Sequence, residues 1–414
     1  MVRGRRGAGA REKWASAVAG LWAAAAGVEL EPARAQGAPI ALTAELQVNQ
    51  FTTGTQISPS VGMRDDGVHV VVWVSAGQDG DGDGIVQRKF ASDGSEPFNE
   101  SVLNQNTAGA QLLPEIGMNA LGDWIAVWDS TAADAGIRGR VSGSNGTTLG
   151  AEIPVSVTTN SAAQIPNAAR ADDDGFIATW DILGAQFRAF DATSTATTGD
   201  ELVAPSLGST SRPAPGFASD GSFAVAFVAN DGNGLGAFAQ RFDADAQPVG
   251  APIPVPESTA NDSTSTSIGV ADDGSFVVGW RDSALGQRLR CFRADGTPRG
   301  GEIALSPLLT GGPRIGMSPQ GHFVATFAVS EMSVQEFDRT CRIVGDDFFA
   351  NTVTAGVQTS PHAAAGRDRY AVVWHTNGVD GDSGSVARRL YRFRTIYADD
   401  FESDDLESWS AVVP

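Results

Sequence analysis

The chain has few of the side chains that enzymes use for nucleophilic or metal chemistry. Its 414 residues include two Cys, three Tyr and four His. No Gly-x-Ser-x-Gly elbow and no His-rich metal spacing accompanies His69, His322, His362 or His375, so we expect none of them to act in catalysis. Basic residues are scarce too. The net charge of −20 argues against nucleic acid as a partner.

Helical periodicity is also missing, whereas turn-forming residues are abundant. The chain holds 49 Gly and 20 Pro, too many for a helical bundle and too few for collagen or low-complexity disorder. Its 20 Phe and 9 Trp supply core material. The composition therefore indicates a folded chain of short elements joined by many turns.

The N-terminus has the three parts of an export signal. Residues 1–13 are basic, residues 14–28 form an uncharged apolar run, and Ala33-Arg34-Ala35 offers a cleavage site. We therefore predict a signal peptide over residues 1–35 and a protein that is secreted, periplasmic or on the cell surface. A retained membrane anchor is the less favoured alternative, because a span needs about 20 apolar residues. No later apolar run approaches that length.

One pattern recurs seven times in the rest of the chain. In its clearest form, a turn glycine is followed six residues later by an aromatic residue, with apolar residues between, as from Gly67 to Trp73. The aromatic anchors lie 47 to 55 residues apart. They are Trp73, Trp128, Trp180, Phe227, Trp280, Phe327 and Trp374.

Each repeat contains four short runs rich in Val, Ile and Phe, bounded by Gly, Asp and Pro, and such runs are typical of strands. A period near 50 residues with four strands indicates a propeller blade. We therefore predict an all-β fold over residues 36–396, a seven-bladed β-propeller of four-stranded antiparallel blades. A parallel β-solenoid is the weaker alternative, because its repeats are shorter and lack hairpin turns.

The two ends of the repeat region are complementary. The last group of strands, ending in YRFRT, has no outer strand after it, and the N-terminal AELQV (44–48) has no group before it. We predict that residues 41–49 complete the seventh blade beside residues 385–394. This pairing would close the ring without a covalent bond.

The repeat resembles one found in many secreted bacterial proteins. It is clearest in VVVWVSAGQDGDGDGIVQRKF (70–90), ANDGNGLGAFAQRFDADAQPVG (229–250) and NTVTAGVQTSP (351–361). That family is mostly uncharacterised, so the resemblance implies a secreted propeller and no particular activity. The acidic C-terminal tail (397–414) is similar to a short segment of exported bacterial proteins, but it has Asp400 and Asp404 where Gly is usual.

Alternating strand direction places the inter-blade loops and the loops between second and third strands on one face. We expect a protein or glycan ligand to bind on this loop face, because long loops on a rigid scaffold commonly carry binding sites. The second-to-third-strand loops are acidic in every repeat, through Asp79, Asp134, Asp181, Asp231, Asp282, Glu331 and Asp380.

The densest acidic loop suggests a metal. Asp79, Asp81 and Asp83 alternate with glycines, and this spacing can turn three carboxylates toward one Ca²⁺ ion. The twelfth position of the loop is Phe90, where an EF-hand has Glu. The competing interpretation is an ordinary acidic turn. Ca²⁺ is the only cofactor that the sequence suggests.

Three functions remain open. The favoured one is a non-catalytic binding or surface-interaction module, expected to be monomeric. The alternatives are a polysaccharide-active enzyme that uses central carboxylates and a purely structural envelope component. The sequence also leaves open whether Cys291 and Cys341 form a disulfide, which an oxidising compartment would permit.

Overall fold

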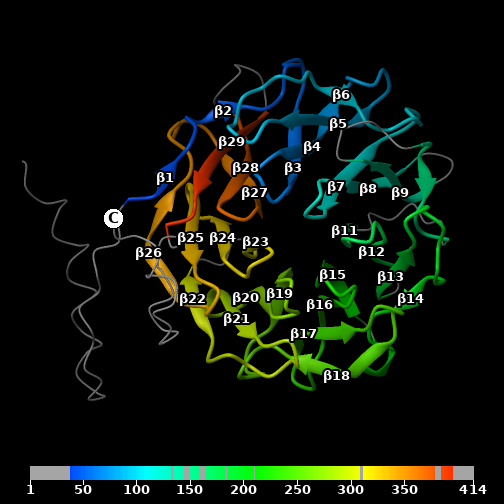
Figure 1. The fold of residues 1–414 in the computed structure, drawn as a ribbon, viewed down its shortest axis with the longest axis vertical. Helices are drawn as coiled ribbons and strands as arrows, with labels where there is room; N and C mark the ends of the chain where they lie inside the picture. Colours follow the sequence, from blue (N-terminus) through cyan, green and yellow to red (C-terminus); the bar gives the residue numbers. More distant parts are fainter. Residues whose placement is uncertain are drawn as a thin grey trace, which may run out of the picture. The chain divides into compact units, whose positions relative to one another are not determined.

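The structure is a computed structural model that describes residues 38–394, apart from 132–134, 144–149, 158–164, 183, 209, 308–310 and 378–383. The predicted signal peptide (1–35) and acidic tail (397–414) lie outside these residues. The described chain forms a seven-bladed β-propeller, as predicted, with antiparallel blades arranged around a central axis (Figure 1).

The first strands lie nearest the centre and are β3 (Gln56–Met63), β7 (Gln111–Met118), β11 (Asn167–Arg170), β15 (Thr210–Phe217), β19 (Ser263–Val270), β23 (Arg314–Met317) and β27 (Gln358–Ala365). The second strands are β4 (His69–Ala76), β8 (Trp124–Ser130), β12 (Phe176–Asp181), β16 (Phe223–Asn230), β20 (Phe276–Asp282), β24 (Phe323–Ala328) and β28 (Arg369–Thr376). The third strands are β5 (Asp83–Phe90), β9 (Gly136–Ser142), β13 (Ala185–Phe190), β17 (Leu235–Phe242), β21 (Gly286–Phe292), β25 (Met332–Phe337) and β29 (Ser385–Arg392).

The outer strands of the first six blades are β6 (Ser101–Val102), β10 (Ile153–Pro154), β14 (Glu201–Leu202), β18 (Pro248–Pro254), β22 (Ile303–Ser306) and β26 (Ile343–Phe349). Those of the seventh are β1 (Ile40–Ala41) and β2 (Leu46–Gln47). A short 3-10 turn, Pro205–Leu207, is the one helical element in the described chain. No described helix has the length and apolar character needed to cross a membrane.

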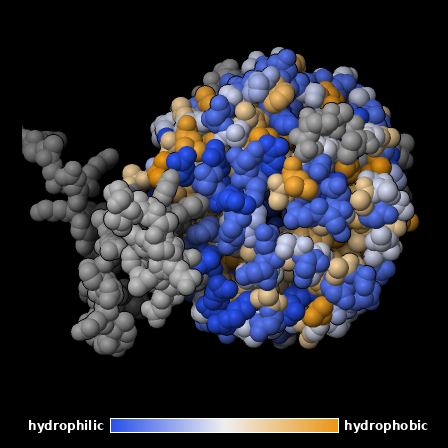
Figure 2. Space-filling model, viewed as in Figure 1, coloured by the Kyte–Doolittle hydropathy of each residue, from blue (hydrophilic) through white to orange (hydrophobic). Residues whose placement is uncertain are grey.

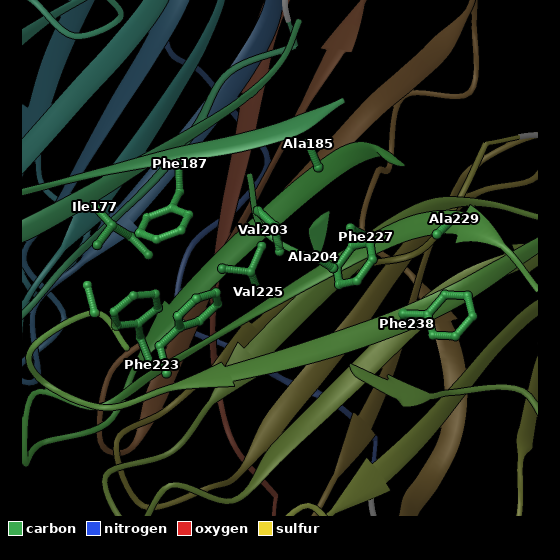
Figure 3. Packing of buried hydrophobic residues seen from close by; sticks show 12 residues of the cluster. Ile177, Ala185, Phe187, Val203, Ala204, Phe223, Val225, Phe227, Ala229 and Phe238 are labelled. Carbon is green, nitrogen blue, oxygen red and sulfur yellow. The ribbon is translucent and has the colours of Figure 1, made fainter. Parts of the chain in front are cut away.

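The second strand of each blade is buried on both of its faces, because neighbouring blades cover both sides of the sheet. Its sequence is therefore a nearly continuous apolar run and does not alternate strictly between apolar and polar residues. All seven predicted anchors are at most 3% exposed. Figure 3 shows one such interface, where Ile177 and Phe187 of the third blade pack against Phe223 and Val225 of the fourth.

Small residues let neighbouring first strands approach closely around the axis. A Cβ atom on Gly117 would lie 2.7 Å from the Ala169 Cα, and one on Gly216 would lie 2.7 Å from a methyl group of Val270. Separations this short do not occur between real side chains, so a larger residue would push the two blades apart. The equivalent glycines Gly62, Gly269 and Gly316 meet the next blade in the same way.

Polar residues of the repeat tie consecutive blades together. Asn104, which follows the outer strand β6, accepts a hydrogen bond from the Ile85 N–H (2.8 Å) and donates one to Gln111 of the next blade (3.0 Å). Asn49 makes the same two contacts across the closure of the ring, with Val386 and Gln56. The recurring Asn and Gln are therefore parts of the blade junction.

Third-strand arginines form a second set of junctions. Arg88 donates from Nη1 to the Val48 carbonyl oxygen of the preceding outer strand (2.8 Å), and Arg140 donates to that of Leu103 (2.8 Å). Arg188, Arg290 and Arg389 make the equivalent bond to the carbonyl oxygens of Val155, Val255 and Ala350. Charge-assisted bonds of this kind are stronger than neutral ones, so they fix the angle between blades.

The disulfide that the sequence left open is formed. Cys291 of β21 is bonded to Cys341, which lies in the turn between β25 and β26, with the two Cα atoms 6.4 Å apart. The bond therefore links the fifth and sixth blades. It is a covalent addition to a junction that packing and hydrogen bonds already make.

The predicted closure of the ring is confirmed, with one difference in detail. β1 pairs with β29 through Ile40 and Arg392, and β2 pairs with it through Leu46 and Arg388. The closing segment is thus two short strands rather than one. Between them the chain bulges, and the Thr43 hydroxyl accepts a hydrogen bond from the Leu390 N–H (3.1 Å).

Removing this segment should open the ring. A chain that starts at residue 50 loses both closing strands and exposes the edge of β29, so we expect aggregation or a large fall in Tm. A chain that starts at residue 38 keeps both strands and serves as the control. Equal thermal unfolding curves for the two chains would contradict closure by β1 and β2.

The closure also differs chemically from the other six blade junctions. Arg388 is fully buried and reaches from β29 into the first blade, where it donates to the Gly94 carbonyl oxygen (2.7 Å) and to Glu96 (3.1 Å). Its guanidinium lies 4.0 Å from the centroid of the Phe90 ring. The strand register aligns Arg388 with uncharged residues in the other blades, namely Gln87, Gly139, Phe187, Ala239, Leu289 and Val334.

His69, the first residue of β4, faces this arginine, a structural role that its place in the repeat did not indicate. It is fully buried, and an aromatic residue occupies its position in all six other blades. Its Nδ1 lies 2.9 Å from the Gly67 carbonyl oxygen, and its Nε2 lies 3.5 Å from Arg388 Nη1. Burial and the neighbouring Arg388 charge lower the pKa of His69 to about 3.

This histidine should make the protein sensitive to acid. The unfolded chain takes up a proton near pH 6.5, whereas the folded chain resists protonation down to about pH 3, so stability falls as the pH drops through that window. We expect His69→Phe to flatten the fall between pH 6.5 and 3. Urea unfolding at several pH values measures the free energy of unfolding. If this free energy falls equally with pH in the wild type and the variant, His69 is not the source of the acid sensitivity.

Candidate functional site

A cavity of about 440 Å³ opens at one end of the central channel, a volume within the usual range of ligand pockets. Its walls come from the start of every first strand, so all seven blades contribute. These strand starts directly follow the inter-blade loops, which places the cavity on the predicted loop face. We call it the mouth cavity.

A recurring backbone irregularity shapes this cavity. Ser58, Leu113, Arg212, Ser265 and Ser360 have positive φ values of 52° to 56°, and the strand register shifts at each of them. A β-bulge of this kind bends the strand and turns its first side chains toward the channel. In four of these five blades the next residue is proline, which is tolerated because the bulge interrupts the hydrogen-bond ladder.

The residues just after the five bulges, together with their counterparts in the third and sixth blades, occupy equivalent positions around the axis. They are Ser60, Glu115, Asn167, Ala214, Ser267, Arg314 and His362. Four of them, Glu115, Asn167, Arg314 and His362, line the mouth cavity. Six different residue types occupy this position in the seven blades, unlike the repeated Asn, Gln and Arg of the blade junctions.

Glu115 is the centre of a polar cluster that spans three further blades. Its Oε2 accepts from the Ser60 hydroxyl (2.8 Å) and lies 3.1 Å from His362 Nε2. Its Oε1 lies 3.4 Å from Arg314 Nη2. On the other side of the ring, His362 Nδ1 lies 3.4 Å from the backbone N of Val61.

This cluster holds a stable charge rather than an activated nucleophile. Burial by itself would raise the pKa of Glu115, but the Arg314 charge and the contacts with His362 and Ser60 outweigh it and lower the pKa to about 2. A Ser–His–acid triad would have the acid on the far nitrogen of the histidine. Here Glu115 contacts the same Nε2 that faces Ser60, and Ser60 is fully buried.

The Glu115 cluster should stabilise the fold above the pH at which glutamate titrates. Because the folded pKa is depressed from 4.5 to about 2, this contribution is present above pH 4.5 and is lost as the pH falls toward 2. We expect Glu115→Gln to cost about 1–3 kcal/mol at pH 7 and less at pH 3.

Urea unfolding of the Glu115→Gln variant at pH 7 and pH 3 measures both values. The exposed Glu201→Gln variant on β14 is the matched control and should leave the free energy of unfolding unchanged at both pH values. A cost for Glu115→Gln that does not depend on pH would show that its charge is not the stabilising feature.

The opposite end of the channel is narrower. Turns between first and second strands form hydrogen bonds with neighbouring turns there, from the Asp272 N–H to Pro319 (2.9 Å) and from the Arg367 N–H to Asp65 (2.9 Å). The cavity at this end is only about 110 Å³. Burial and the nearby Asp172 and Asp65 carboxylates raise the pKa of Asp272. The channel is therefore open to a ligand chiefly from the loop face.

The calcium hypothesis gains no support from the geometry. The described chain contains no group of three or more His, Cys, Asp or Glu side chains arranged to hold a metal ion. Asp79 instead accepts from Asn104 Nδ2 (2.8 Å) and from the Asp81 N–H (3.2 Å), and Asp81 faces the Gly109 N–H (3.4 Å). A Ca²⁺ site at Asp79, Asp81 and Asp83 stays a prediction from the sequence.

Several other acidic loop residues also have structural partners. Glu331 accepts a hydrogen bond from Asn351, Asp282 accepts from the Ala284 and Leu285 N–H groups, and Asp231 accepts from the Asn233 N–H. Asp181 accepts weakly from the Arg212 N–H (3.4 Å). Asp134 and Asp380 lie outside the described residues. The acidic character of these loops therefore arises largely from turn formation.

Sequence reasoning missed the residues of the mouth cavity. It expected no catalytic role for His362, and it gave no role to Glu115, Arg314 or Arg212. A usable signal was present, since Glu115, Arg314 and His362 each follow the proline near the end of the repeat's inter-blade motif. That position varies between repeats, while the residues around it recur.

The comparisons with known proteins identify the fold alone. No protein-family model and no curated protein matches the sequence. A protein of unknown function from Dyadobacter fermentans DSM 18053 is 12% identical, with a TM-score of 0.51 over 84% of this chain and 98% of that one. Raptor from Chaetomium thermophilum is 10% identical, with a TM-score of 0.55 over 85% of this chain and 29% of that one.

A GH93 α-L-arabinofuranosidase of Fusarium graminearum is 11% identical, with a TM-score of 0.46 over 84% of this chain and 98% of that one. Neighbours at such low identity transfer neither activity nor ligand.

Proposed function

We propose that this protein is a secreted, non-catalytic binding propeller that holds a protein or glycan ligand in its mouth cavity. The export-type N-terminus and the resemblance to secreted repeat proteins support its localisation. The cavity supports binding, because it is the larger open end of the channel and variable side chains from seven blades line it.

The number of carboxylates in the mouth cavity, and the contacts that they make, favour binding over hydrolysis. Glycoside hydrolysis ordinarily needs two carboxyl groups on either side of the bond, about 5–10 Å apart. Glu115 is the one carboxylate among the described residues that line the mouth cavity, and it is committed to Arg314, His362 and Ser60. The described lining can therefore hold a ligand but does not supply the usual pair of acids for cleaving a glycosidic bond.

Blocking the cavity tests the proposal. Ile165 lines the cavity and is 38% exposed, so Ile165→Trp should fill part of the cavity with little cost to folding. Val249 is 37% exposed on the outer strand β18, and Val249→Trp is the matched control. Labelled mature protein is applied to peptide and glycan arrays. Signals that Ile165→Trp abolishes and Val249→Trp retains are the expected result.

A second assay separates this proposal from the alternatives. Release of reducing sugar from any polysaccharide, lost in Ile165→Trp, would show that the cavity is catalytic and would overturn the proposal. No array signal for the wild type would favour the structural envelope component. Array signals that survive Ile165→Trp would place the binding surface outside the mouth cavity.

A further inference from the structure

The lining of the mouth cavity is asymmetric. Leu113 and Ile165, from the second and third blades, present aliphatic side chains at the bulge level. Arg212 and Arg314, from the fourth and sixth blades, present guanidinium groups. Two arginines in one cavity are notable in a chain with a net charge of −20. The cavity thus has an aliphatic part and a cationic part.

Arg212 is held in place by its backbone and remains available through its side chain. Its φ of 54° belongs to the bulge, and its residue is exposed. Its Nη1 donates to the Ser265 hydroxyl (3.2 Å), the one side-chain partner we find for this guanidinium among the described residues. Asp181 accepts a hydrogen bond from the backbone N–H of Arg212 (3.4 Å). Burial raises the pKa of Asp181, although this hydrogen bond and the Arg212 charge act in the opposite direction.

Arg314 is oriented by Glu115, and this contact uses only one of its guanidinium nitrogens. Nη2 faces Glu115 Oε1 at 3.4 Å, and the side chain is 38% exposed to the cavity. Guanidinium carries five N–H donors, so most of them remain for a ligand. Glu115, in turn, is shared among Arg314, His362 and Ser60. The cluster therefore presents a fixed cation at the wall of the cavity.

The same lining favours peptide over sugar. Sugar rings commonly stack on aromatic faces, but the described lining contains no Trp, Tyr or Phe. It is rich in proline, whose rings offer flat aliphatic contacts for side chains. The lining prolines are Pro59, Pro114, Pro166, Pro213, Pro313 and Pro361.

We propose that the mouth cavity binds a peptide segment in which an Asp or Glu lies next to an aliphatic residue. The carboxylate is held by Arg212 and Arg314, and the aliphatic side chain packs against Leu113, Ile165 and the prolines. Arginine suits this role because its planar donors match both oxygens of a carboxylate. This inference rests on the proposed binding function and specifies its ligand class.

The test uses the mature chain and an array of hexapeptides with randomised flanks around a fixed central pair. The pairs are Leu-Asp, Leu-Asn and Ser-Asp, and oligogalacturonate is added as an acidic sugar probe. We expect Leu-Asp peptides to bind at least about tenfold more tightly than Leu-Asn or Ser-Asp peptides. Raising the salt concentration should weaken the Leu-Asp signal more than the Leu-Asn signal.

Arginine variants supply the second readout. The Arg212→Gln/Arg314→Gln double variant should lose about tenfold in affinity for Leu-Asp peptides and little for Leu-Asn peptides. Arg293→Gln is the matched control, because Arg293 is exposed in the turn after β21 at the opposite end of the strands. Because Arg314 also pairs with Glu115, we expect the double variant to melt at a lower temperature than the wild type. A cooperative melting transition well above the assay temperature checks that each variant is folded.

The outcomes separate this inference from the proposed function. Equal binding of Leu-Asn and Leu-Asp peptides, or oligogalacturonate binding without peptide binding, would overturn the acidic-peptide assignment while leaving the cavity as a binding site. Leu-Asp binding that the arginine variants leave intact would also overturn it. Binding of any probe that Ile165→Trp does not affect would instead refute the mouth cavity as the site.

Discussion

The structure depends on the junction between one blade and the next. A four-stranded sheet of this size cannot cover its own two faces, so each blade is stable only when neighbours bury both of them. The seven anchors of the second strands, from Trp73 to Trp374, are almost completely buried between blades. Because the junctions form a circle, the seventh blade must also pack against the first. The seventh blade is itself assembled from both ends of the chain, since β1 and β2 pair with β29.

This requirement explains most of the repeated polar residues. The Asn that follows several outer strands contacts both the third strand of its own blade and the first strand of the next, and third-strand arginines reach the preceding outer strand. Their recurrence reflects the geometry of a junction that is made repeatedly. Residues that recur for this reason are already satisfied within the fold and have little capacity left for a ligand.

Functional variety is therefore found where the repeat leaves a position unconstrained. The residue that follows the proline near the start of a first strand is one such position, and it is Glu115, Arg314 or His362 in three of the blades. Hairpin turns pair with one another and narrow one end of the channel, whereas the mouth cavity opens at the other end, beside the bulges and inter-blade loops. The face seen in Figure 2 is mostly hydrophilic around the centre of the ring, with apolar residues in small separate patches.

Local chemistry was enough to predict the strands, the seven blades, the anchors and the closing segment. Gly and Asp turns and apolar runs depend on residues that are close together in the sequence, so each strand can be predicted locally. Repetition of this local pattern about every 50 residues then predicts the blades. The bulge in the closing segment, between β1 and β2, was not predictable in this way, because it depends on how Thr43 meets Leu390.

Tertiary structure alone decided the site. Glu115 and His362 are 247 positions apart in the sequence and meet only because the ring brings the second and seventh blades to one axis. Likewise, His69 is buried beside Arg388 only because the seventh blade packs against the first. Closure of the ring sets both contacts, and no periodicity in the sequence encodes which side chains meet across the channel.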